Sequence, residues 1–317
     1  MEKKVRVSRL QAGDILLLEP SEDWISKLIV KITKSPVSHT ALSCGQAAEV
    51  GTVIEETPPS AVKDSILSRT GRTAYVMRLR SEAEDFQPVM DVAGRYVREK
   101  LPYANAQLPF IALYCLVFNI TGGKRLQGFV TRLMGLALGI VMEMENQSVY
   151  GGKEAMMCSQ FAYHCYKETG KKYEIRMKAD KITGPIDRML QMVSRDLKKY
   201  NDQVFGFRTD PVLIRDEEVT EVLSGLYGEL ENGQDGQLLL GADFPPDDFI
   251  VGASRFCVRF VKAYSKDGRD MAEKDIVYYW EKLKEMEEYF ITPGDLLSNT
   301  ENLVCQGTVD YEGFHGD

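Results

Sequence analysis

Hydrophobic residues in the first hundred positions recur in short runs, which is typical of β-strands separated by turns. Four runs predict strands, over residues 10–18, 37–43, 53–57 and 74–80. Apolar residues at helical spacing predict a helix after Pro20-Ser21 and another that begins near Pro88. The loop of residues 44–52 reverses the chain and makes a β-hairpin of its flanking strands.

A further helix is predicted to begin at Cys158. Phe161, Ala162 and Cys165 follow it by three, four and seven residues, so all four share one apolar stripe. Glycines 151 and 152 precede this helix, and Gly170 follows it. Cys158 would therefore lie in the first turn.

The rest of the chain, from residue 173 onward, mixes strand-like and helix-like patterns. We expect strands over residues 173–177, 204–208 and 255–263, and helices over residues 182–200, 219–230, 276–290 and 292–297. A polar stretch near Asn201 suggests a boundary. The sequence thus predicts an α+β protein with a first domain over 1–200 and an α+β extension of unknown role over 201–317.

An apolar stretch, residues 107–144, interrupts the first domain as a helical insertion. A break at residues 122–125 leaves two halves, each shorter than the 18 to 20 residues that span a bilayer. Two buried helices are the favoured interpretation. The alternative is an apolar lid or groove that makes peripheral contact with an acyl chain or lipid surface.

Composition narrows the function. A net charge of -8 argues against nucleic acid as a partner, because phosphate contacts need a basic face. The six cysteines show neither a disulfide framework nor metal-ligand spacing, so we expect no metal and no cofactor. The amino terminus lacks a secretory pattern, which favours a cytoplasmic protein. Oligomeric state is left open.

Cys158 has the surroundings that a nucleophile needs, because a helix N-terminus favours a thiolate over a thiol. A thiol is activated by an imidazole, which a third polar group orients. His39, in the 37–43 strand, and Glu55, in the 53–57 strand, can fill these roles. Strand alternation does not decide between Glu55 and Glu56, and a core cysteine with a structural histidine is the alternative interpretation.

The chain resembles the circularly permuted branch of the NlpC-type papain-like cysteine hydrolases, which includes the YiiX-like proteins and is similar to the lecithin:retinol acyltransferases. The resemblance covers roughly residues 10–185. It rests on five motifs in order, Gly-Asp-Ile-Leu (13–16), Ser-His-Thr-Ala-Leu (38–42), Val-Ile-Glu-Glu-Thr-Pro (53–58), Pro-Tyr (102–103) and Cys-Ser-Gln-Phe (158–161). In this branch the histidine strand precedes the cysteine helix, as it does here.

The resemblance implies an antiparallel sheet packed on the nucleophile helix. It makes Cys158 the nucleophile, His39 the general base and Glu55 the orienting residue, with Glu56 as the open alternative. It places Tyr103 near the substrate pocket. Gln160 is a departure, since many relatives carry a glutamate there.

We therefore expect a thiol hydrolase that forms an acyl-enzyme at Cys158, with the Cys158 backbone N–H helping to hold the oxyanion. The resemblance favours an amidase or peptidase that acts on small peptides, including cell-wall-derived ones. A lipid acyl hydrolase or acyltransferase is the first alternative. A non-catalytic binding module on the same fold is the second, because geometry rather than inventory makes a triad.

Overall fold

The computed structural model describes residues 3–45, 50–103, 112, 132–141, 156–205, 216–232, 247–264 and 275–312. The chain divides into two compact units. Unit 1 comprises Met1–Asn105, Lys153–Lys178 and Ile291–Asp317, and unit 2 comprises Ala106–Gly152 and Ala179–Phe290. Within the described ranges, no helix combines the length and apolar character that crossing a membrane requires.

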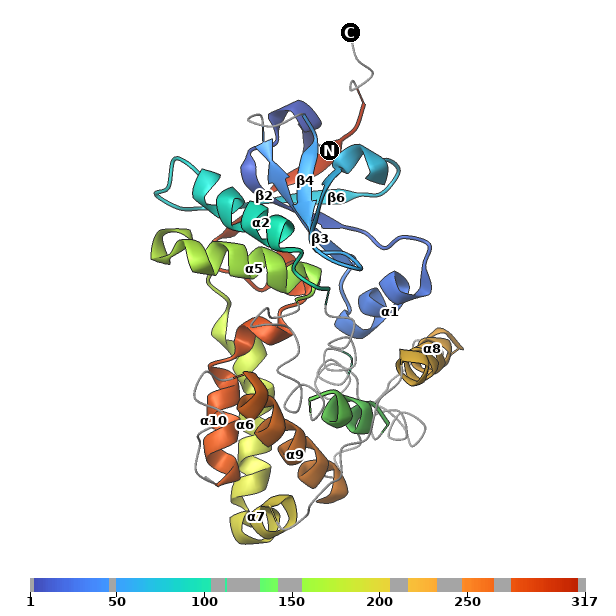
Figure 1. The fold of residues 1–317 in the computed structure, drawn as a ribbon, viewed down its shortest axis with the longest axis vertical. Coiled ribbons are helices and arrows are strands. Elements are labelled where there is room, and N and C mark those ends of the chain that lie inside the picture. The colour runs from blue at the N-terminus through green and yellow to red at the C-terminus, as the bar shows by residue number, and fades with distance from the viewer. Residues whose placement is uncertain are drawn as a thin grey trace. The chain divides into compact units, whose positions relative to one another are not determined.

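Unit 1 is built on a seven-stranded sheet (Figure 1). Its strands are β1 (Lys4–Arg6), β2 (Ala12–Leu18), β3 (His39–Cys44), β4 (Thr52–Glu55), β5 (Val62–Ser65), β6 (Ala74–Leu79) and β7 (Leu303–Asp310). They lie in the order β1-β7-β6-β2-β3-β4-β5. The sheet is mixed rather than wholly antiparallel as expected, because β1 pairs with β7 in parallel.

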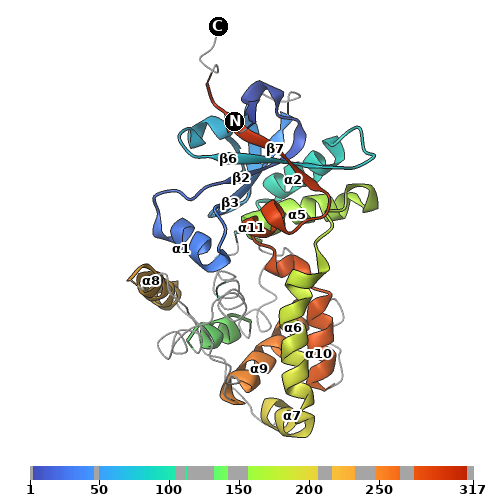
Figure 2. The same ribbon diagram turned by 180° about the vertical axis from the view of Figure 1, so that it is seen from behind.

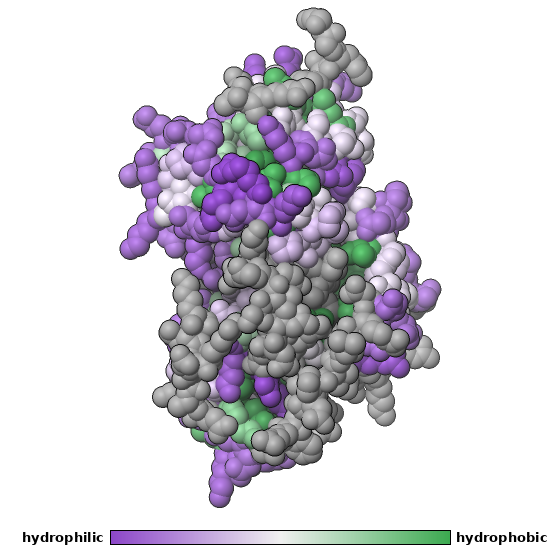
Figure 3. Space-filling view, viewed as in Figure 1, coloured by the Kyte–Doolittle hydropathy of each residue, from purple (hydrophilic) through white to green (hydrophobic). Residues whose placement is uncertain are grey.

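Two helices cover one face of this sheet, α2 (Gln87–Glu99) and α5 (Cys158–Thr169). Alternate residues of the strands, including Ile15, Leu42 and Ile54, form one core with Phe161 and Ala162 of α5. The outward side of α2 carries hydrophilic side chains (Figure 3). The predicted helix over residues 158–165 and its apolar stripe are confirmed.

The opposite face of the sheet has a core of its own. Val53 of β4, Ala41 of β3 and Leu16 of β2 pack there with Val5 of the edge strand β1 and Val309 of β7. Helix α1 (Trp24–Thr33) connects β2 to β3, and the Asp23 carboxylate caps it by accepting the Ser26 N–H at 2.8 Å. The helix is therefore capped by Asp23, two residues after the Pro20-Ser21 pair that precedes the expected helix.

The C-terminal segment belongs to unit 1. Helix α11 (Pro293–Ser298) contacts α5, and β7 then enters the sheet between β1 and β6 (Figure 2). The division therefore differs from the expected boundary near Asn201, where helix α7 (Leu197–Phe205) continues without a break. Strand pairing over a long sequence separation leaves no local trace from which a boundary could be placed.

The described part of unit 2 is helical. Its helices are residues 132–141, α6 (Ala179–Ser194), α7, α8 (Asp216–Asn232), α9 (Asp247–Tyr264) and α10 (Ile276–Lys284). Of the expected apolar insertion over 107–144, only residues 112 and 132–141 lie within the described residues, and they are helical. The predicted helix over 219–230 is confirmed. The predicted helix over 182–200 is two helices, because α6 ends at Ser194 and α7 begins at Leu197. The predicted helix over 276–290 ends at Lys284 and is followed by a 3₁₀ turn over Glu287–Phe290.

Three predicted strands are wrong. Residues 255–263 lie in α9, because Ala253, Cys257, Phe260 and Val261 are buried at helical spacing, although Phe260 and Val261 are of types that favour strands. Residues 204–205 end α7, and 206–208 lie outside the described residues. Residues 171–173 form a 3₁₀ turn, and a single bridge from Met177 to Thr300 is all the pairing found in 173–177.

Gly307 lies at a bulge in β7, opposite Val76, with φ +134. A Cβ there would overlap the Lys3 carbonyl, which accepts the Thr308 N–H at 2.9 Å. We expect Gly307→Ala to lower the free energy of unfolding by about 2–3 kcal/mol, measured by urea denaturation. Gly71, at φ +95 with open space around it, is the matched control, and Gly71→Ala should cost about 1 kcal/mol. Equal losses would contradict a role for the overlap.

Candidate active site

The β3–β4 hairpin brings together the histidine and one of the two glutamates that the sequence singled out. Ala41 pairs with Glu55, so His39, two residues before Ala41, shares a strand face with Glu55. His39 Nε2 lies 2.5 Å from Glu55 Oε2. Glu55 is buried, whereas His39 keeps 17% of its side chain exposed.

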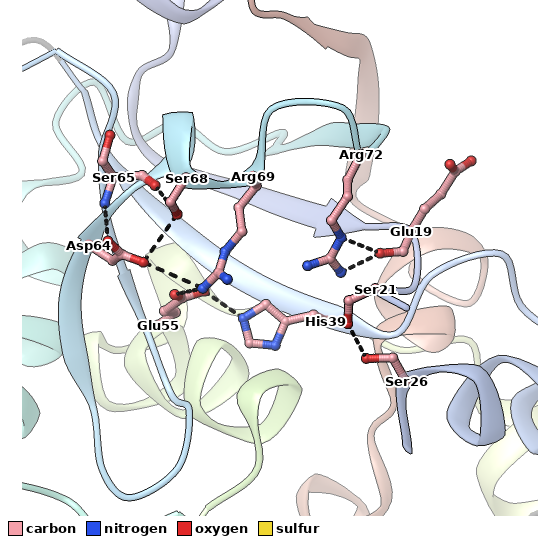
Figure 4. A network of polar contacts seen from close by, with 10 residues as sticks. All are labelled: Glu19, Ser21, Ser26, His39, Glu55, Asp64, Ser65, Ser68, Arg69 and Arg72. Atoms are coloured by element: carbon pink, nitrogen blue, oxygen red, sulfur yellow. Dashed lines mark hydrogen bonds and ion pairs between the residues drawn. The ribbon is translucent and has the colours of Figure 1, made fainter. Parts of the chain in front are cut away.

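Arg69 completes the surroundings of Glu55 (Figure 4). It ends a 3₁₀ helix, Ile66–Arg69, and its guanidinium pairs with the Glu55 carboxylate. The same group lies 3.5 Å from Asp64 Oδ2. Burial raises the pKa of Glu55, but hydrogen bonds and charge from His39 and Arg69 outweigh it and lower that pKa to about 2. Glu55 is therefore ionised at neutral pH.

Sequence reasoning missed Arg69. It lies 14 positions after Glu55 in a short turn between β5 and β6, and one arginine among many surface cations gives no signal. The pairing of β4 with β5 places Ser65 opposite Thr52, so the Ile66–Arg69 turn follows beside the start of β4, and the Arg69 side chain reaches along the strand to Glu55.

Cys158 is the first residue of α5 and is buried. Two contacts fix this helix start. The Gln160 side-chain oxygen accepts the Met157 N–H at 3.1 Å, and the Ser159 hydroxyl donates to the Ile291 carbonyl at 2.7 Å. Gln160, the departure from the expected glutamate, therefore has a capping role at this helix.

Cys158 and His39 interact. Burial lowers the pKa of His39, but charge and hydrogen bonding from Cys158, together with the Glu55 carboxylate, raise it to about 9. A protonated imidazole between a sulfur and a carboxylate is the charge distribution that a thiolate–imidazolium pair requires. His39, Cys158 and Glu55, predicted as a group, are brought together.

Glu56 lies on the other side of β4 from Glu55. Ile54, two residues before it, packs against α5, while Val53 and Glu55 face the opposite way. Neither Glu56 oxygen has a hydrogen-bond partner among the described residues. Of the two candidate glutamates, Glu55 is thus the one hydrogen-bonded to His39.

Tyr103 approaches the same region. Its N–H donates to the Pro59 carbonyl at 3.1 Å, and it forms a bridge with Met156, two residues before Cys158. Burial raises the pKa of the Tyr103 hydroxyl, and the nearby charges of Cys158 and Glu56 raise it further. The phenol therefore keeps its proton and can donate a hydrogen bond.

Asp14, in the Gly-Asp motif, has a structural role. Its carboxylate is buried within β2 and accepts two hydrogen bonds from Arg78, both at 2.7 Å. Gly13, at φ +80, lies in the bulge that begins this strand. The motif thus supports the sheet next to β3 and supplies no group to the site.

Comparison with known proteins does not assign the chain to a family. The chain matches no family model, and a search of curated proteins found no significant similarity. The chemistry of the site rests on the arrangement of Cys158, His39 and Glu55.

Proposed function

We propose that this chain is a cysteine-dependent acyl-transfer enzyme of the circularly permuted papain-like type. The observation that supports this proposal is the hydrogen bond between His39 Nε2 and the ionised Glu55, together with the raised pKa of His39, to which the charge and hydrogen bonding of Cys158 contribute. The chain order, with the histidine strand before the cysteine helix, fits the permuted arrangement. The favoured reaction is hydrolysis of an amide in a small peptide, including peptides derived from cell walls.

The arrangement allows a two-step reaction. His39 takes the Cys158 thiol proton, and the sulfur then attacks the substrate carbonyl carbon to form a tetrahedral intermediate. The Cys158 backbone N–H has no acceptor within the helix and stabilises the oxyanion. When the C–N bond breaks, His39 delivers its proton to the leaving amine. Water, deprotonated by His39, then hydrolyses the acyl-enzyme.

In this scheme Glu55 orients the His39 imidazole and stabilises its protonated form. Its hydrogen bond to Nε2 leaves Nδ1 for the Cys158 sulfur, and its negative charge stabilises the imidazolium. Arg69 holds Glu55 in the ionised form through the ion pair at the other carboxylate oxygen. In this scheme Tyr103 contacts the substrate beside Cys158, a role supported by its bridge with Met156.

Alkylation by iodoacetamide tests the proposal without knowledge of the substrate. At pH 6 we expect Cys158 to react at least about tenfold faster than Cys305, an exposed free cysteine that serves as the internal reference. Burial raises the pKa of Cys44, Cys165 and Cys257, so these thiols should react slowest. The measurement is peptide mass spectrometry over time.

His39→Ala should bring the Cys158 rate down to that of Cys305 or below, because the imidazolium that stabilises the thiolate is gone. If Cys158 of the wild type reacts no faster than Cys305, and His39→Ala changes nothing, the enzymatic proposal fails. A binding module on this fold would then be the function to pursue.

A further inference from the structure

Glu56 is a buried carboxyl group that the proposed reaction leaves without a role. Its side chain is fully buried, and both oxygens lack a hydrogen-bond partner among the described residues. A buried polar group without a partner lowers stability, so native proteins seldom keep one except where function requires it. Glu55, its neighbour, is by contrast bonded to both His39 and Arg69.

Other open polar atoms accompany Glu56. The pairing of Ala41 with Glu55 places Thr40 opposite Glu56, and Ser38 follows on the same strand face. The hydroxyl oxygens of Thr40 and Ser38 are buried and also have no partner in the described part of the chain. This face of β3 and β4 is the one toward α5. The side chains of Glu56, Thr40 and Ser38 therefore lie beside the helix that carries Cys158 and can still form hydrogen bonds.

The charge of Cys158 also acts on Glu56. Burial and the charge of Cys158 raise the pKa of Glu56 to about 9, and Glu56 in turn acts on Tyr103 and Cys165. At neutral pH the group is thus an uncharged carboxylic acid with one O–H donor. A carboxylic acid kept neutral by its surroundings can donate a hydrogen bond to a developing negative charge.

Building on the proposed function, we propose that Glu56 is a catalytic residue that donates its O–H to the substrate carbonyl oxygen next to Cys158, as a second oxyanion donor beside the Cys158 N–H. As the C–S bond forms, the carbonyl π electrons move onto this oxygen. As the C–N bond breaks, they return, and the leaving amine takes its proton from His39. Glu56 keeps its own proton throughout and is unchanged at the end of the cycle.

The test compares two reactions of Cys158 in the full chain. Acetylation by p-nitrophenyl acetate passes through an oxyanion, whereas alkylation by iodoacetamide displaces iodide and does not. We expect Glu56→Leu to slow acetylation about 100-fold and to leave the alkylation rate within about twofold of wild type. Glu56→Gln keeps an N–H donor of similar length, so it should acetylate within about fivefold of wild type.

Several results would overturn the proposal. These results are acetylation of Glu56→Leu at the wild-type rate, a loss of alkylation in Glu56→Leu as large as its loss of acetylation, and an equal loss of acetylation in Glu56→Gln. A structural role predicts a lower melting temperature in Glu56→Leu, whereas removal of an unpartnered carboxyl should leave it equal or higher. A wild type that is neither alkylated quickly nor acetylated at Cys158 refutes the proposed function itself. An active wild type with an unaffected Glu56→Leu refutes only the role of Glu56.

Discussion

Cys158→Ala is expected to abolish acyl-enzyme formation, with a loss of at least about 10³-fold in the rate of p-nitrophenolate release from p-nitrophenyl acetate. The reason is that Cys158 supplies the sulfur that forms the new bond, and no other described cysteine interacts with His39. Mass spectrometry of the intact chain, quenched during turnover, should show an acetyl group on the wild type and none on the variant.

Cys165→Ala is the matched control for this experiment. Cys165 lies on the same helix and is also buried, seven residues further on. Its removal should change the rate by less than about twofold. The double variant His39→Ala, Cys158→Ala should be no slower than Cys158→Ala alone, because residues that act as a unit are not additive. Retention of the acetyl group in Cys158→Ala would place the nucleophile elsewhere.

Glu55→Gln is expected to move the alkaline limit of acyl transfer downward. The amide keeps an acceptor for His39 Nε2 but removes the negative charge that helps to hold the His39 pKa at about 9. The limit should therefore shift from about pH 9 toward 6.5, the ordinary pKa of histidine. A pH–rate profile with p-nitrophenyl acetate, recorded between pH 5 and 10, measures this shift.

The same substitution should reduce stability by roughly 2–3 kcal/mol at pH 6, measured by urea denaturation. The pH dependence of this stability loss follows from the pKa shifts of Glu55 and His39. The depressed pKa of Glu55 gives stability that is complete above pH 4.5 and is lost as pH falls toward 2. The raised pKa of His39 gives stability that is complete below pH 6.5 and is lost as pH rises through 9. The difference between the variant and the wild type should thus be greatest between about pH 4.5 and 6.5.

Asp64→Asn is the control for Glu55→Gln. Asp64 is the other carboxylate near Arg69, at 3.5 Å, but it does not contact His39 and is more exposed than Glu55. Its substitution should leave the alkaline limit in place and cost less than about 1 kcal/mol. An equal shift in both variants would show that Arg69, rather than the Glu55–His39 contact, sets the pKa of His39.

Local sequence predicted much of unit 1. The alternation in residues 37–43, 53–57 and 74–80 predicted β3, β4 and β6, since a strand with a buried face repeats every two residues. The apolar stripe after Cys158 predicted α5, because a helix packed on a sheet buries positions three and four apart. Cys158 and His39 came from the same sequence patterns, because the chemistry of thiol activation restricts the residue types, whereas the preference for Glu55 over Glu56 came from the family resemblance.

Other features depend on contacts between distant parts of the chain. β7 pairs with β1 and β6, which lie more than 200 residues earlier in the chain. No local sequence pattern could therefore assign residues 303–310 to unit 1. Helix α9 was mistaken for a strand because its aromatic and β-branched residues favour strands, and only burial at helical spacing decides the matter.

The site divides in the same way. The sequence determined that a cysteine begins a helix, that a histidine lies on a strand before it, and that two glutamates follow on the next strand. Only the tertiary structure decided which glutamate meets His39, because strand alternation points Glu55 and Glu56 to opposite faces and register chooses between them. It also brought Arg69 to Glu55 and left Glu56 buried without a partner among the described residues, since both depend on what packs across each face.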